Sequence, residues 1–99
     1  MWVQAYLKRL EIQNIAAYVT AHGDDHSGAI LIKVIKMDGS AQLYQKTFDL
    51  QSNKNAWVRI SEGLDKEIDS LLEKQKVYDP DLWVVEIEST SGQNYLDEF

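Results

Sequence analysis

The chain has 99 residues, of which 44% are hydrophobic, so it can build one packed core but not two. Its 16 acidic and 10 basic side chains give a net charge of −6, which repels nucleic acid and anionic membrane surfaces. Cysteine is absent, which excludes disulfides, thiolate metal sites and cysteine nucleophiles, so we expect a single cytoplasmic domain over residues 1–99.

Apolar residues at helical spacing open the chain and predict a first helix of about three turns that ends near Asn14. These residues are Trp2, Val3, Tyr6, Leu7 and Leu10. Strand-like runs follow at 15–21 and 29–35, and the polar turn 23–28 separates them. Because the run 29–35 is apolar on both faces, it is typical of a central strand.

A hairpin is predicted next. Asp38 and Gly39 lie between the runs 29–35 and 41–48, and both residues tolerate the positive φ of a tight turn. A polar loop then leads to a short strand at 57–60. These runs should pair antiparallel because short turns connect them.

The second helix is predicted to begin with Ser61 as its N-cap. Pro80 disfavours helical geometry in the residue before it, so this helix should end at or before Tyr78. Its buried stripe is expected to consist of Leu64, Ile68, Leu71 and Leu72. A strand at 82–87 follows, and a short extension at 94–96 can add one more.

The resulting order is α-β-β-β-β-α-β(-β), which predicts an α+β domain with one mostly antiparallel sheet of five or six strands. We expect the two helices, with one apolar stripe each, to cover a single face of this sheet. The other face would stay open and would carry the surplus aromatic residues. An open apolar face predicts self-association as a homodimer or binding of a protein partner.

One turn gathers both histidines with two carboxylates, which are reasonable zinc ligands. These residues are His22, Asp24, Asp25 and His26. Two histidines four residues apart share a face only on a helix, and this stretch is a turn. The simpler interpretation is a solvated loop in which Asp24 accepts backbone hydrogen bonds. No metal or cofactor is therefore expected, and these four residues remain the candidates if a metal does bind.

The segment 79–88 is the most distinctive in the chain. Glu86 and Glu88 project from one face of a strand, roughly 6.5–7 Å apart, and such a pair can bind a cation or share acid–base chemistry. The same alternation also arises in an ordinary sheet with Trp83 inward and the glutamates in water. No obvious nucleophile or electrophile lies nearby. The candidates for partner contacts are Asp79, Asp81, Trp83, Glu86 and Glu88.

A nuclease of the restriction-endonuclease-like class needs an acid followed by an acid-x-lysine element that holds a metal. Lys33 has Leu31 at the position where that element needs an acid, and the strand of Glu86 and Glu88 has no lysine. The nuclease hypothesis therefore fails on its residues as well as on charge.

Several segments, spread from about Trp2 to Glu98, carry a family resemblance. They are Gly23-Asp24, Gly28-Ala29, Lys33-Val34, Asp38-Gly39, Trp57-Val58-Arg59 and the run from Asp79 to Glu88. Together they resemble domain-of-unknown-function family 1491, a group of small alphaproteobacterial proteins. The resemblance implies a bacterial cytoplasmic protein without an assigned activity, and it brings no catalytic residues to this chain. The sequence pattern of this family does not include His22 or His26.

The leading hypothesis is a non-catalytic binding or protein-interaction domain that self-associates, rather than an enzyme. It rests on the open sheet face, the aromatic residues and the lack of a catalytic motif. The alternative is a small metal-dependent enzyme that uses the turn of Asp24, Asp25 and His26, or the strand pair Glu86 and Glu88.

Overall fold

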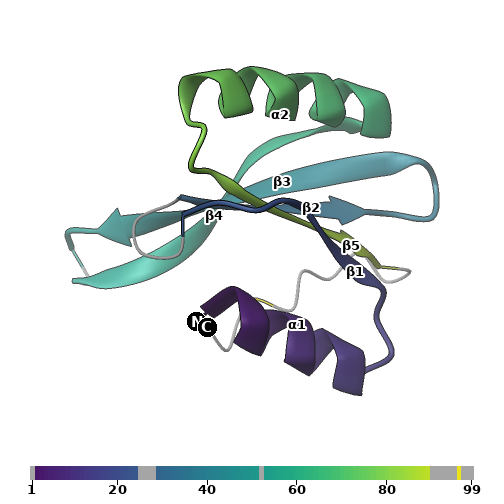
Figure 1. The fold of residues 1–99 in the computed structure, drawn as a ribbon, viewed down its shortest axis with the longest axis horizontal. Coiled ribbons are helices and arrows are strands. Elements are labelled where there is room, and N and C mark those ends of the chain that lie inside the picture. Colours follow the sequence, from purple (N-terminus) through teal and green to yellow (C-terminus); the bar gives the residue numbers. More distant parts are fainter. Residues whose placement is uncertain (1, 25–28, 52, 90–95, 97–99) are drawn as a thin grey trace.

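A computed structural model describes residues 2–24, 29–51, 53–89 and 96. Two helices lie on a five-stranded sheet, which confirms the predicted α+β class (Figure 1). In chain order the elements are α1 (Trp2–Ile12), β1 (Ala17–Ala21), β2 (Ile30–Ile35), β3 (Ser40–Asp49), β4 (Lys54–Leu64), α2 (Asp65–Tyr78) and β5 (Trp83–Glu88). Neither of these helices combines the length and apolar composition that a membrane crossing requires.

The strands are arranged in the order β1-β5-β2-β3-β4. Three neighbouring pairs are antiparallel, and β2 with β5 is the parallel exception. The sheet is therefore mixed, although mostly antiparallel as predicted. The parallel pair arises because the chain leaves β4, runs through α2 and returns to insert β5 between β1 and β2.

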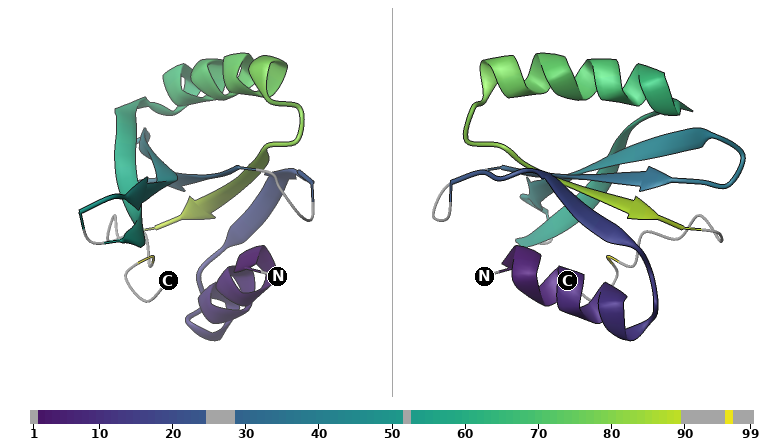
Figure 2. Two further views of the ribbon diagram at one scale, coloured as in Figure 1. Left: turned by 90° about the vertical axis from the view of Figure 1, so that its left-hand side faces the viewer. Right: turned by 45° about the vertical axis from the view of Figure 1, so that its right-hand side comes forward.

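The two helices lie on opposite faces of the sheet, so the prediction that both cover one face was wrong (Figures 1 and 2). The core under α1 consists of Val3, Tyr6, Leu10, Ile32, Val34, Trp83, Val85, Ile87 and Leu96. The core under α2 consists of Leu31, Ala41, Leu43, Ile68, Leu72, Leu82 and Val84. The physical reason is that β2 and β5 are apolar on both faces, so each face needs a cover.

β4 is longer than the sequence predicted and runs directly into α2. Its pairing with β3 continues until Leu64 lies opposite Ser40, so Ser61 is a strand residue and its prediction as N-cap was wrong. The backbone N–H of Leu64 instead donates to Glu67 Oε1 at 3.0 Å at the start of the helix. Leu64 itself is exposed, contrary to the expectation that it is buried.

Two other boundaries are confirmed. α2 ends at Tyr78, just before the residue that precedes Pro80. The hairpin between β2 and β3 turns at Gly39, whose φ is +85°, and the Asp38 carboxylate accepts from the Ser40 N–H at 2.9 Å. The predicted turn residues Asp25 and His26 lie outside the described residues, as does the extension at 94–96 apart from the buried Leu96.

Candidate functional site

The candidate site lies in one row of residues that crosses the sheet on the α2 face. The register aligns Tyr18, Glu86, Lys33, Leu43 and Ser61 from β1 to β4. Directly opposed residues project from the same face with Cβ atoms about 4.5–5.5 Å apart. Lys33, on the central strand, therefore lies beside Glu86 and below α2.

Lys33 is buried, and its ammonium group is surrounded by carboxylates. Only 1% of the residue is exposed. Its Nζ lies 2.6 Å from Asp69 Oδ1 and 3.0 Å from Glu86 Oε1, and it also contacts Asp65 Oδ1. Asp65 and Asp69 are one turn apart on α2, so both carboxylates reach the sheet from the same side of the helix. Three acids from two elements thus hold one cation.

The surroundings fix the protonation state of Lys33. Burial alone lowers the pKa of Lys33, but the hydrogen bonds to Asp65, Asp69 and Glu86 outweigh that effect and raise the pKa above its ordinary value. A lysine that acts as a base or a nucleophile needs a lowered pKa instead. Lys33 is therefore an ammonium ion at neutral pH, and its ion pairs with Asp65 and Asp69 connect α2 to the sheet.

The three carboxylates are also the described residues best placed to hold a metal. Oxygen atoms of Asp65, Asp69 and Glu86 lie within 4.8 Å of one another, an arrangement that suits a hard divalent cation. The Lys33 ammonium group already contacts all three carboxylates. A metal would therefore have to bind on their solvent side, where the side chains of Asp65 and Asp69 are 46% and 59% exposed.

A shallow hollow adjoins this cluster at the carboxyl ends of the parallel strands β2 and β5. Its volume is about 210 Å³, and its lining consists of Ile35, Lys36, Met37, Glu88 and Ser89. Ile35 lies opposite Glu88 in the register, one row beyond the pair of Lys33 and Glu86. Carboxyl ends of neighbouring parallel strands are a common place for ligands.

The segment 79–88 divides between the two faces of the sheet. Glu86 joins the Lys33 cluster, and Glu88 is exposed beside the hollow. Trp83 is buried in the core under α1, and its Nε1–H donates to the carbonyl of Asp24 at 2.8 Å. The other two candidates form the turn after α2, where the Asp81 N–H donates to Asp79 Oδ1 at 3.2 Å.

Of the turn that the sequence offered as a metal site, the structure describes residues 22–24, which contact the start of β5. The Asp24 N–H donates to the Asp81 carbonyl at 3.1 Å, and the exposed His22 ring lies 4.1 Å from the Trp83 ring between centroids. Gly23 is packed so closely that an added Cβ would lie 2.3 Å from the Asp81 carbonyl oxygen. These contacts give Gly23 and Asp24 a structural function in the attachment of this turn to β5, and that function needs no ligand.

Sequence reasoning missed Asp65 and Asp69 as candidate site residues, and it did not assign Lys33 a partner. One signal was present. A charged side chain in a strand that is apolar on both faces must be buried, and a buried charge needs an opposite charge. The spacing of Asp65 and Asp69 offered two carboxylates on one side of a helix.

Comparison with known proteins places the chain in a family. The family model described as "Protein of unknown function (DUF1491)" matches residues 1–97. A crystal structure of a DUF1491 family protein from Caulobacter crescentus CB15 is similar, with 31% identity, a TM-score of 0.85, and coverage of 98% of this chain and 90% of that chain. An NMR structure of a DUF1491 family protein from the same organism has 31% identity, a TM-score of 0.83, and coverage of 97% and 88%.

A third similar structure is the solution structure of protein Atu0922 from A. tumefaciens. It has 30% identity, a TM-score of 0.75, and coverage of 90% of this chain and 82% of that chain. No curated protein matches. The match over residues 1–97 and the agreement in fold show that this chain belongs to the DUF1491 family.

Proposed function

We propose that this protein is a non-catalytic, cytoplasmic protein-interaction domain that binds a basic segment of a partner protein. Its binding surface is the part of the α2 face that the helix leaves open, here called the open strip, formed by Tyr18, Ile35, Met37, Glu86 and Glu88. One observation carries the proposal. Glu88 is exposed beside the hollow, and in the described part of the chain neither Lys36, which also lines the hollow, nor another basic side chain forms an ion pair with it.

The protonation of Lys33 supports a non-catalytic function. Its raised pKa and its burial keep the ammonium group from acting as a nucleophile or a base. The carboxylates of Asp65, Asp69 and Glu86 around it form ion pairs with the same ammonium group. The cluster therefore has the properties of a structural connection between α2 and β2.

The chemistry of the open strip supports a basic partner. Glu86 and Glu88 lie on one face of β5 at roughly 6.5–7 Å, which is also the spacing of alternate side chains in an extended peptide. Glu86 is already paired with Lys33, so a lysine or arginine of the partner would pair with Glu88, and the residue two positions along would lie over Glu86. Tyr18 and Met37 are 52% and 81% exposed. They can make apolar contacts with the aliphatic part of the partner's lysine or arginine side chains. The net charge of −6 favours the encounter.

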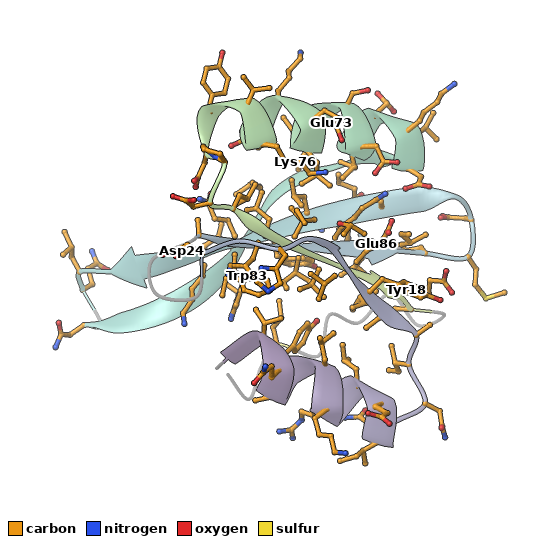
Figure 3. The ribbon with its side chains drawn as sticks, in the orientation of Figure 1. Tyr18, Asp24, Glu73, Lys76, Trp83 and Glu86 are labelled. Carbon is orange, nitrogen blue, oxygen red and sulfur yellow. The ribbon has the colours of Figure 1, made fainter. Side chains whose placement is uncertain are left out.

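Calorimetric titration of the full chain with an extended peptide of alternating lysine and arginine residues tests this proposal. We expect binding that weakens as salt rises, because exposed charges are screened. Glu88→Gln should weaken binding several-fold. The matched control is Glu73→Gln, which removes the same charge from a side chain that is 74% exposed on α2, away from the open strip (Figure 3). Equal losses in both variants, or no binding by the wild type, would refute the proposal.

A second candidate function, a metal-dependent enzyme, is favoured by the carboxylate oxygens of Asp65, Asp69 and Glu86 within 4.8 Å of one another. A thermal-shift series with magnesium, manganese, calcium and zinc tests it. A rise in melting temperature that disappears in Asp69→Asn would support the metal site. An unchanged melting temperature with all four ions would leave the interaction proposal as the better account.

A further inference from the structure

We propose that two copies of this chain pair through their β1 strands, antiparallel and around a twofold axis, so that their sheets join into one. β1 and β4 are the edges of the sheet, and among the described residues no strand lies on the outer side of β1. An edge strand presents unpaired backbone groups that another strand can satisfy. This surface shares the Tyr18 side chain with the open strip, but it is formed by the backbone edge of β1, so the inference does not rest on the proposed function.

The two edges differ in protection. β1 has the sequence Ala-Tyr-Val-Thr-Ala, without a charge or a proline, and Val19 is 39% exposed. β4 carries Arg59 and Glu62, which pair at 3.1 Å, whereas the ladders of both edges contain one register irregularity. Charges on an edge strand are a usual protection against pairing with another strand. β1 is therefore the edge that can accept a second copy.

The hydrogen bonds to β5 show which backbone groups of β1 point outward. The Glu88 N–H donates to the Ala16 carbonyl at 3.0 Å. In an antiparallel ladder, hydrogen-bonded pairs alternate along each strand, so Ala16 and Tyr18 direct their backbone groups toward β5. Ala17 and Val19 consequently direct their N–H and C=O groups to the outer side of the sheet.

Of the registers that these outward groups allow, the one centred on Tyr18 keeps all its hydrogen bonds within the regular part of β1. Ala17 of one copy lies opposite Val19 of the other, and the two such pairs exchange four hydrogen bonds across the twofold axis. Tyr18 then faces Tyr18 of the second copy at a pair without hydrogen bonds, where side chains are closest. The ladder from β1 to β5 becomes irregular between Val19 and Ala21. The regular part of β1 therefore includes Val19, the last residue that forms hydrogen bonds in this register.

The charge of the chain does not oppose this pairing. Glu86 lies next to Tyr18 across the ladder, so the two Glu86 residues in a pair are separated by three strand spacings, roughly 14 Å. That distance exceeds the Debye length of about 8 Å at physiological ionic strength. The contact between the two copies is itself uncharged. Because β4 is protected, the association closes at two copies instead of forming a filament.

Disulfide trapping tests the register. The chain has no cysteine, so Tyr18→Cys introduces its single thiol. In the proposed register the two Cα atoms lie about 4.5 Å apart, which is within the range that a disulfide spans. We expect mild oxidation to convert most of Tyr18→Cys to a covalent dimer. The control is Val58→Cys, on the protected edge at 44% exposure, which should cross-link much more slowly.

Sedimentation of the unmodified chain and two lysine variants gives the second readout. We expect a wild-type dimer at about 100 μM, at least tenfold weaker association for Val19→Lys, and unchanged association for Val58→Lys. A monomeric wild type, equal effects of the two lysine variants, or equal cross-linking of the two cysteine variants would overturn the inference. Because Tyr18 belongs to both surfaces, peptide binding is judged separately by Glu88→Gln, which lies on β5 and leaves the β1 edge unchanged.

Discussion

At the scale of single residues, Lys33 is the position where sequence and structure are most tightly connected. A charged side chain in a buried strand costs folding free energy unless opposite charges surround it. Here Asp69 and Glu86 hold its ammonium group at 2.6 Å and 3.0 Å, and Asp65 contacts it as well. The position of α2 over the sheet is therefore coupled to the charge state of one side chain.

Lys33→Met tests this coupling, because it removes the ammonium group and keeps an apolar chain. We expect the free energy of unfolding at neutral pH to fall by about 2 kcal/mol, since three carboxylates would face one another without a cation. Urea denaturation measures the change. Lys76→Met, which breaks only the exposed pair with Glu73 at 3.3 Å, should cost less than about 0.5 kcal/mol. Similar losses in both variants would contradict the structural function of Lys33.

The pH dependence of stability follows from the raised pKa of Lys33. A raised pKa in the folded state means that the charged form favours folding, so the contribution is complete below the ordinary lysine value of about 10.4. It is lost as pH rises from there toward the folded-state value. The stability difference between wild type and Lys33→Met should therefore shrink above about pH 10.4. A difference that stays constant from about pH 8 to about pH 11 would contradict the ion cluster.

The sequence predicts part of this cluster. Lys33 stands in a run that is apolar on both faces, so its burial and its need for an opposite charge can be inferred. Glu86 was recognised as a candidate residue of a β-strand. The identity of the other partners could not be inferred, because it depends on which turn of α2 crosses β2. That alignment results from tertiary packing and from the late start of α2 at Asp65.

At the scale of elements, the contact between the turn after β1 and the start of β5 depends on a close backbone approach. A Cβ at Gly23 would lie 2.3 Å from the Asp81 carbonyl oxygen and 2.5 Å from Trp83 Cδ1. Atoms that belong to backbone and to a buried ring cannot move aside easily. The Trp83 hydrogen bond to Asp24 at 2.8 Å requires the same approach.

Gly23→Ala should therefore lower the free energy of unfolding by about 2–3 kcal/mol. Gly63→Ala is the matched control in β4, where the nearest atom to a new Cβ is Glu67 Oε1 at 3.4 Å, at the end of a flexible side chain. We expect a change below about 0.5 kcal/mol in that control. Thermal and urea unfolding of both variants measure the difference. A Gly23→Ala protein as stable as wild type would contradict the close approach of Gly23 to Asp81 and Trp83.

The boundaries of the helices and strands follow the local preferences of their residues, except where the long pairing of β3 with β4 extends a strand. Pro80 correctly predicted the end of α2, and Asp38-Gly39 correctly predicted the hairpin. Ser61 is a good N-cap by its chemistry, yet pairing with β3 extends β4 past it to Leu64. Strand propensity depends on the neighbouring strand, and that neighbour is not visible in a local stretch of sequence.

At the scale of the whole molecule, one sheet separates two cores, one under each helix (Figure 2), although the length of the chain predicted a single core. Adjacent residues of β5, Val84 and Val85, belong to the core under α2 and the core under α1, respectively. The apolar character of both faces of β2 was visible in the sequence, whereas β5 was predicted with a single apolar face. Which helix covers which face was not visible, because it depends on the insertion of β5 between β1 and β2.

The shared strands predict that both cores unfold together. Leu10→Ala under α1 and Leu72→Ala under α2 each remove a buried side chain and should cost about 2–4 kcal/mol. Because β2 and β5 contribute to both cores, we expect a single thermal transition in each variant, at a lower temperature than in wild type. Differential scanning calorimetry checks this, and a separate early transition in either variant would mean that the two helices unfold independently.

Amide chemical-shift mapping during titration of the labelled full chain with the basic peptide tests the proposed binding function most directly. We predict the largest changes at Tyr18, Ile35 and Glu88 in the open strip, with small changes along the solvent side of α2. Changes centred on Glu73 and Lys76, or spread evenly over the acidic residues, would contradict a specific interaction surface on this face of the sheet.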